Sequence, residues 1–393
     1  MRANCSILLL VAAALVGCTT PYRDPVTVHG GSPFPGIAGL VENTGAAQVD
    51  VLMVHGMCTH TSADANASID ALVAALDGNL VADAEPPRAL ALGEGGGIET
   101  VVRTVRVGAA RLRFTAIIWS PLTRGLKSQL AYDITGQATN CTEPGDCRPQ
   151  RALLNGQLKD GLLNDCLADA IIYQGDSRRL IRQRMIDAIT RTVDAAQSQA
   201  RAEGLATGPF AIVTDSLGSK ITFDALDEMT SSPELPAPPG PKAAGATVIG
   251  RLAVIYMRAN QMPLLSLADQ VIDSGPSAAK SLQPAGDSLQ RLLMRKAEQP
   301  ALSSAAQACK PHRMTLVAFT DPNDLLSYRL LSTRYALPGI AVADVLVSNA
   351  PTWFGAVEMP TTAHTGYARN AGVARLVVCG SAGSVLCRDR PTR

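Results

Sequence analysis

Short apolar runs that end abruptly at small or polar residues recur along this chain, and they constrain its fold more than any other feature. The first run covers residues 49–54 and stops at His55-Gly56, and five more lie at 114–119, 210–213, 252–256, 314–319 and 342–347. Runs of this length are typical of strands that are buried on both faces of a parallel sheet. Segments with helical periodicity separate several of the runs. The sequence therefore predicts an α/β fold with a doubly wound, mostly parallel sheet and helices on both faces.

The strongest helical signal precedes the third run, where apolar residues recur every four positions at Ile181, Met185, Ile189 and Val193. Further helices are predicted over 217–229 and from about residue 367. Two stretches, about 122–168 and 265–310, interrupt the alternation, and we predict that they are insertions, the first of them a lid. The chain has no internal repeat. We therefore predict one domain over residues 46–393.

Composition limits the class of partner. Hydrophobic residues make up 47% of the 393 residues and charged residues 18%, so a large buried core is feasible. The chain has 35 Lys and Arg against 34 Asp and Glu, and no basic tract. This balance gives no electrostatic reason to expect nucleic acid as a partner.

The N-terminus carries the features of an export signal. Arg2 provides a positive start, and residues 7–16 form an apolar run that is too short to span a bilayer as a stable helix. The run ends at Leu15-Val16-Gly17-Cys18, which resembles the lipobox of bacterial lipoproteins. This resemblance implies that residues 1–17 are removed and that Cys18 is lipidated. Secretion with an unmodified Cys18 is the alternative.

A lipidated Cys18 would anchor the protein to a membrane without spanning it. Thr19 follows the cysteine in place of Asp, which for such lipoproteins implies the outer membrane of the bacterial cell envelope, facing the periplasm. Residues 18–45 are rich in Gly and Pro and show no sustained period. We predict that they form a tether and an irregular lead-in to the domain.

Export would place the cysteines in an oxidising compartment, where they can pair. Seven cysteines remain beyond Cys5 and Cys18, namely Cys58, Cys141, Cys147, Cys166, Cys309, Cys379 and Cys387. The pairs Cys141/Cys147 and Cys379/Cys387 are the predicted disulfides, because each closes a short loop. Seven is odd, so at least one thiol stays free or pairs between chains. We predict no metal site, even at His55, Cys58 and His60, the group nearest to a ligand set.

The residues after the third run carry the first sign of chemistry. Thr214-Asp215-Ser216-Leu217-Gly218 stands between the predicted strand 210–213 and a helical segment. Ligands of parallel α/β sheets bind beyond the carboxyl ends of the strands. A sharp strand-to-helix turn there projects the serine hydroxyl above the sheet and directs the helix N-terminus at developing negative charge. Ser216 is therefore a candidate nucleophile, and a Ser–Gly turn without a catalytic role is the alternative.

Partners for Ser216 follow the last two runs. The run at 314–319 leads to a turn that contains Asp321 and Asp324, and the run at 342–347 leads to a loop with His364 just before the final helix. The chain has five histidines, and His364 is the one that lies C-terminal to both carboxylates. The alternative for His364 is a solvent-facing residue that caps the last helix. Asp321 precedes Pro322, a pair that is typical of turns.

This order of Ser, Asp and His resembles the α/β-hydrolase superfamily of serine esterases and lipases, over roughly Val49 to Cys387. The resemblance implies an α/β-hydrolase fold and a catalytic triad of Ser216, Asp324 and His364. It favours Asp324 over Asp321, because an acidic residue before apolar Leu325-Leu326 matches the turn of the family. Asp321 stays the alternative acid.

The same resemblance assigns an oxyanion hole. His55-Gly56-Met57 is similar to the His-Gly loop of the family, which implies that the backbone N–H groups of Met57 and Leu217 hold the oxyanion. Thr214 and Asp215 depart from the commoner Gly-His before the serine. Asp215 thereby adds a carboxylate beside the nucleophile.

The implied activity is acyl transfer from a carboxylic ester, either a small molecule or a lipid-like ester, through an acyl-enzyme. No cofactor is expected. Two other functions remain open at this point. One is transfer of the acyl group to an alcohol or amine instead of water, and the other is a non-catalytic envelope protein that keeps the fold as a binding module.

Overall fold

The computed structural model describes residues 18–30, 33–44, 47–78, 81–83, 88, 97–135, 150–232, 240–270, 286–299 and 314–387. The predicted export segment 1–17, the predicted Cys141/Cys147 pair and Cys309 lie outside these residues. No helix in the described ranges is long and apolar enough to cross a membrane.

A nine-stranded mixed sheet forms the centre of the described fold, in the order β2-β10-β9-β8-β7-β3-β6-β5-β4. Six neighbouring strands, from β10 to β6, are parallel, and β2, β5 and β4 each run antiparallel to their neighbour. The strands are β2 (Val26–His29), β3 (Ala47–Val54), β4 (Val81–Asp83), β5 (Glu99–Val107), β6 (Ala110–Ile118), β7 (Ala206–Asp215), β8 (Leu252–Arg258), β9 (Met314–Thr320) and β10 (Ile340–Leu346). Each of the six apolar runs lies on one of the parallel strands. The predicted mostly parallel sheet is confirmed.

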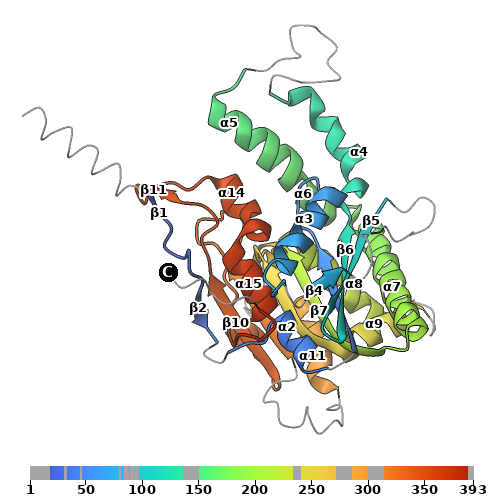
Figure 1. Cartoon of the computed structure of the whole chain (residues 1–393). Helices are drawn as coiled ribbons and strands as arrows, with labels where there is room; N and C mark the ends of the chain where they lie inside the picture. The colour runs from blue at the N-terminus through green and yellow to red at the C-terminus, as the bar shows by residue number, and fades with distance from the viewer. Residues whose placement is uncertain are drawn as a thin grey trace, which may run out of the picture.

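Helices cover both faces of the sheet, as predicted (Figure 1). Alternate residues of β3 show the division: Leu52 and Val54 pack into one apolar cluster, and Val51 and Met53 into the other. The first cluster includes α7 (Arg178–Ala202), α8 (Leu217–Ser231), α9 (Pro241–Arg251) and α11 (Ser288–Glu298). The second includes α2 (Ile37–Glu42), α3 (Ser62–Val73) and α15 (Ala371–Cys379). Shorter helices are α6 (Ala168–Gln174), α10 (Met262–Leu265), α13 (Ser332–Tyr335) and α14 (Pro360–Thr365).

The segment 18–45 differs from the predicted tether, because it forms part of the folded body. β2 adds an edge strand beside β10, and α2 buries Ile37, Ala38, Leu40 and Val41. β1 (Cys18–Thr19) pairs with β11 (Thr352–Trp353) in a separate two-stranded sheet. Elements of two to six residues, interrupted by Gly and Pro, are too short to produce a periodic signal in the sequence.

The predicted insertion at 122–168 coincides with a helical arm that projects from the body (Figure 1). We define the arm as residues 124–135 and 150–167. It consists of α4 (Arg124–Lys127) and η2 (Ser128–Asp133), followed by α5 (Leu153–Gln157) and the π-helix η3 (Leu158–Leu167). The Lys127 ammonium lies 2.7 Å from the Asp165 carboxylate and ties the two halves together at the base of the arm. The second predicted insertion, 265–310, is not simply an excursion, since its helix α11 buries Leu289, Leu292 and Leu293 in the core.

Candidate active site

Ser216 stands at a sharp turn between β7 and α8. Its backbone has φ 50° and ψ −125°, a left-handed conformation that non-glycine residues rarely adopt. The turn packs tightly against the end of β3, since a Cβ on Gly218 would lie 2.2 Å from the His55 carbonyl oxygen. A Cβ on Gly56 would lie 2.8 Å from the Cβ atom of Ser216. This is the strained strand-to-helix turn that the sequence pattern predicts, and it places Ser216 where the strand order of the sheet reverses.

Thr214 and Asp215, which replace the commoner Gly-His before the serine, each contact another polar side chain. The hydroxyl of Thr214 is buried and lies 2.9 Å from that of Ser219. The Asp215 carboxylate accepts hydrogen bonds from Nε and Nη2 of Arg258, with the Nη2–Oδ2 distance 2.8 Å. Arg258 is buried at the end of β8, and its carbonyl oxygen accepts the Ser216 N–H. The extra carboxylate beside the serine is therefore neutralised by a bidentate ion pair.

The structure brings Ser216, His364 and Asp324 into one hydrogen-bonded chain. Ser216 Oγ lies 3.2 Å from His364 Nε2, and His364 Nδ1 lies 2.9 Å from Asp324 Oδ1. All three residues are between 2 and 5% exposed. His364 belongs to the short helix α14, whereas the sequence predicts a loop at this position, and it is buried rather than solvent-facing.

Asp321, the alternative acid, contacts other groups. Its carboxylate accepts the backbone N–H of Asn323 at 3.0 Å and that of Asn349 at 2.6 Å. It therefore joins the turn after β9 to the loop after β10. Asp324 is the carboxylate that reaches His364, and Asp321 holds the turn that positions it.

Tyr367 is a residue of this site that the sequence analysis did not identify. Its hydroxyl donates to Asp324 Oδ2 at 3.1 Å and accepts the N–H of Asp321 at 2.7 Å. Burial and the neighbouring Asp324 charge raise the pKa of Tyr367, which keeps the phenol protonated as a donor. Its position three residues after His364, one helical turn away, is the signal that points to it.

Glu358 lies beside Asp321, and its carboxyl group has a strongly raised pKa. Its oxygens accept the Asn323 side-chain amide at 2.8 Å and the Ala350 N–H at 3.1 Å. Burial, and then the Asp321 charge, raise the pKa of Glu358 to about 7. Glu358 therefore keeps its proton at pH values where an exposed glutamate loses it.

We expect Glu358→Gln to stabilise the protein at alkaline pH by on the order of 1–2 kcal/mol. In the native chain the unfolded state releases the Glu358 proton above its ordinary pKa of 4.5, while the folded state retains it up to about 7. Folding stability therefore falls as pH rises through this window and stays reduced above it. Thermal unfolding of both proteins across the window is the measurement. A Tm difference that grows towards acid pH would contradict the raised pKa of Glu358.

The loop His55-Gly56-Met57 follows β3 beside Ser216. His55 Nε2 accepts the Trp119 N–H at 3.0 Å, and its Nδ1 lies 2.8 Å from the Gly56 carbonyl oxygen. The ring therefore carries its proton on Nδ1, and burial lowers the pKa of His55 well below its ordinary value. Because N–H and C=O point in opposite directions across a trans peptide, this contact turns the Met57 N–H away from the ring. Among the described residues, no hydrogen bond uses the N–H of Met57 or Leu217.

A disulfide joins this loop to the arm, because Cys58 pairs with Cys166. Asp169 on α6 adds a second tie by accepting the Cys58 N–H at 2.9 Å. The sequence did not predict this pair, because 108 residues separate its members. Since Cys58 is oxidised, it offers no thiolate to a metal beside His55 and His60. The predicted pair Cys379/Cys387 is confirmed.

We expect the double variant Cys58→Ser/Cys166→Ser to lose about 2–4 kcal/mol of unfolding free energy. For the acyl-transfer activity that the sequence predicts, we also expect kcat to fall by roughly tenfold, because the Met57 N–H moves with Cys58 when the loop loosens. Denaturant unfolding and ester hydrolysis measure the two effects. The matched control is Cys379→Ser/Cys387→Ser, which opens a loop of 8 residues away from Ser216 and should leave kcat unchanged. Equal losses of kcat in both variants would contradict a role of the Cys58–Cys166 disulfide in positioning the Met57 N–H.

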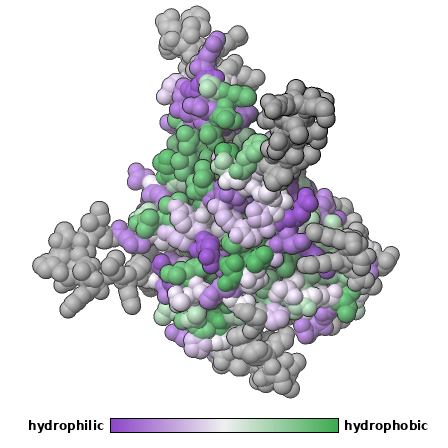
Figure 2. Space-filling model, turned by 90° about the vertical axis from the view of Figure 1, so that its left-hand side faces the viewer, coloured by the Kyte–Doolittle hydropathy of each residue, from purple (hydrophilic) through white to green (hydrophobic). Residues whose placement is uncertain are grey.

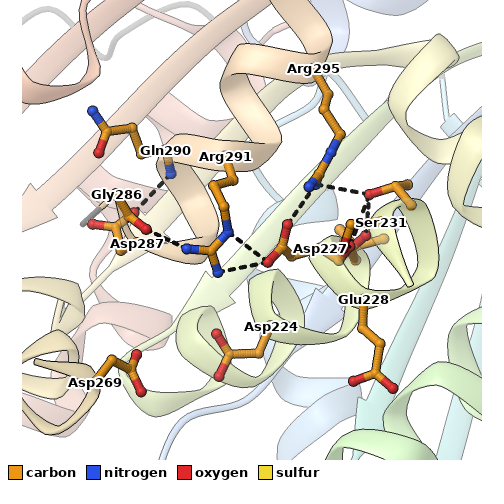
Figure 3. Close-up of polar contacts among 12 residues, drawn as sticks. Asp224, Asp227, Glu228, Ser231, Asp269, Gly286, Asp287, Gln290, Arg291 and Arg295 are labelled. Atoms are coloured by element: carbon orange, nitrogen blue, oxygen red, sulfur yellow. Dashed lines mark hydrogen bonds and ion pairs between the residues drawn. The ribbon is translucent and has the colours of Figure 1, made fainter. Parts of the chain in front are cut away.

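A charged cavity of about 310 Å³ lies beside the other end of α8 and shares no residue with the triad (Figure 3). Its acidic side chains are engaged by arginines: Arg291 lies 2.7 Å from Asp227, and Arg178 lies 2.6 Å from Asp269 and 2.8 Å from Asp224. These ion pairs join α8 to α7 and α11. The cavity is therefore a polar contact region between helices.

Comparison of the chain with protein-family models, curated proteins and solved structures gives no match. The functional argument therefore depends on the geometry of the site.

Proposed function

We propose that this chain is a serine hydrolase with an α/β-hydrolase fold that cleaves carboxylic esters. The observation that carries the proposal is the hydrogen-bonded chain from Ser216 through His364 to Asp324, with the serine at a strained strand-to-helix turn. A buried Ser–His–Asp chain of this geometry activates a hydroxyl for acyl transfer.

The placement of these residues on the sheet supports the fold assignment. The serine follows β7, the acid follows β9 and the histidine comes after β10, in the chain order Ser, Asp, His that is typical of α/β-hydrolases. All three positions lie beyond the carboxyl ends of parallel strands, where such sheets bind ligands.

In the proposed mechanism His364 Nε2 takes the proton of Ser216 as Oγ attacks the ester carbonyl carbon. Asp324 holds the Nδ1 proton and stabilises the imidazolium, and Tyr367 holds Asp324. The backbone N–H groups of Met57 and Leu217 bind the oxyanion of the tetrahedral intermediate. His364 returns the proton to the leaving alcohol and then activates a water, which releases the acid from Ser216. The chemistry requires no cofactor.

The proposed location is the bacterial cell envelope, with Cys18 lipidated and the chain held at the periplasmic face of the outer membrane. Cys18 is free and exposed at the first described position, which is compatible with lipidation of its thiol. A membrane-anchored hydrolase meets lipid-like esters at high local concentration, so we propose esters of this class as substrates.

Labelling with a fluorophosphonate probe tests the proposal, because such probes react with activated serines. We expect the native chain to be labelled and the Ser216→Ala variant to remain unlabelled. Hydrolysis of p-nitrophenyl esters of graded chain length then defines the acyl preference, and competing alcohols reveal transfer in place of hydrolysis. Absence of both labelling and hydrolysis would favour a non-catalytic binding protein and overturn the proposal.

A further inference from the structure

An exposed apolar hairpin begins in β11 and leads to α14. Trp353 and Val357 pair across it, with the Trp353 N–H donating to the Val357 carbonyl oxygen at 2.7 Å. Four large side chains on it are exposed, with Trp353 at 57% and Phe354 at 68%, and we call these four the hairpin patch: Trp353, Phe354, Val357 and Met359. Apolar side chains that stay in solvent contribute no burial free energy to folding. A group of such side chains at one place is typical of an interaction surface.

The hairpin turn holds Phe354 in an unfavourable backbone conformation. Phe354 has φ 51° and Gly355 has φ 65°, so both central residues are left-handed. Asn or Gly is the usual choice at the first of these positions, and a bulky residue there is strained. The ring of Phe354 points into solvent and does not compensate the strain inside the fold. A contact outside the molecule would account for an aromatic side chain at this strained position.

The hairpin patch is directly beside Cys18. In the pairing of β1 with β11, Cys18 is the register partner of Trp353, and Thr19 is the partner of Thr352. The Thr352 hydroxyl donates to the Thr19 carbonyl oxygen at 2.9 Å. The residue that would carry acyl chains is thus fixed next to exposed aromatic side chains, with no flexible spacer between them.

The arm extends the apolar surface on the same side of the molecule. Figure 1 shows β1, β11 and α14 together at the left of the body. Figure 2, which views the molecule from that side, shows hydrophobic residues along the arm below its tip. Exposed apolar side chains of the arm include Leu126, Leu130, Leu153, Leu154 and Leu163. α14 contacts η3, so the base of the arm and the helix that carries His364 adjoin.

We propose that the hairpin patch is a membrane-binding surface that inserts into the interfacial region of a phospholipid bilayer beside the acyl chains on Cys18. Aromatic and aliphatic side chains at one tip are the groups that enter this region of a bilayer. α14 begins one residue after the patch, so docking holds the side of the molecule that carries His364 at the lipid surface. The proposal rests on the proposed lipid anchor for its orientation, and mass spectrometry of the native chain tests that anchor separately.

Intrinsic fluorescence tests the insertion, because the chain has two tryptophans and Trp119 is fully buried. The probe is the Cys18→Ser chain, produced without residues 1–17 as the proposed cleavage would leave it, so that no acyl chain contributes to binding. With vesicles of phosphatidylethanolamine and phosphatidylglycerol we expect a blue shift of Trp353 emission and quenching by brominated lipids. An unchanged spectrum at saturating lipid overturns the proposal. This result is independent of whether Ser216 reacts with the fluorophosphonate.

Phe354→Gly separates membrane binding from folding. We expect its vesicle affinity to fall by roughly tenfold, since one buried aromatic side chain is lost from the bilayer. We expect its Tm to rise, because glycine adopts the left-handed conformation without strain. The matched control is Val385→Ser, an 83% exposed apolar residue beside Glu42, which should bind vesicles as the parent does. Unchanged affinity in Phe354→Gly overturns the proposal, as does an effect of the variant on self-association alone.

Discussion

Ser216→Ala is expected to lower kcat for ester hydrolysis by on the order of 10⁴–10⁶-fold, with little change in KM. The variant removes Oγ, which lies 3.2 Å from His364 Nε2 and is the atom that would form the acyl-enzyme. The surroundings of Ser216 and the backbone N–H groups of Met57 and Leu217 stay, so binding should persist. Steady-state kinetics with a p-nitrophenyl ester measures the effect. Activity within tenfold of the parent would place the reaction on another residue.

Ser216→Gly should be as inactive as the alanine variant and yet more stable than it, by about 1 kcal/mol. Ser216 has φ 50°, which both serine and alanine tolerate poorly and glycine tolerates well. Comparison of Tm between the two inactive variants isolates this strain from the loss of the hydroxyl. A glycine variant less stable than the alanine variant would show that the turn is not strained.

Asp324→Asn should have the second largest effect, with kcat lower by about 10⁴-fold. An asparagine amide would donate to His364 Nδ1 and drive the imidazole proton to Nε2, which must be free to accept from Ser216. Asp321→Asn is the matched control, because Asp321 accepts backbone N–H groups of Asn323 and Asn349. We expect it to lower Tm and to change kcat far less. The reverse ranking of the two variants in kcat would make Asp321 the acid.

The parallel core of the sheet was predictable because its six strands are buried on both faces and therefore appear as continuous apolar runs. The antiparallel strands were not predicted, for different reasons. β2 is four residues long and exposed, and β4 has three residues. β5 mixes charged and apolar residues, because Glu99 and Arg106 face solvent while most of its other side chains are buried.

The residues of the candidate site also divide into those that the sequence predicts and those that it does not. Ser216 was predictable from a local turn pattern, and His364 from its position in a chain with few histidines. Arg258 and Tyr367 act through contacts that the sequence does not encode locally. Arg258 neutralises Asp215 from the neighbouring strand, and Tyr367 orients Asp324 from the 3-10 turn between α14 and α15. The Cys58–Cys166 disulfide depends on the docking of the arm, which no periodic pattern predicts.

That disulfide makes the proposed catalytic loop dependent on the compartment in which the chain resides. In a reducing cytosol the thiols of Cys58 and Cys166 would stay apart, and the loop after β3 would lack its covalent tie to the arm. Oxidation after export would complete the oxyanion-binding loop, so the newly made chain would gain full activity only outside the cytosol. The proposed hydrolase would thereby spare the esters inside the cell while the chain is being made.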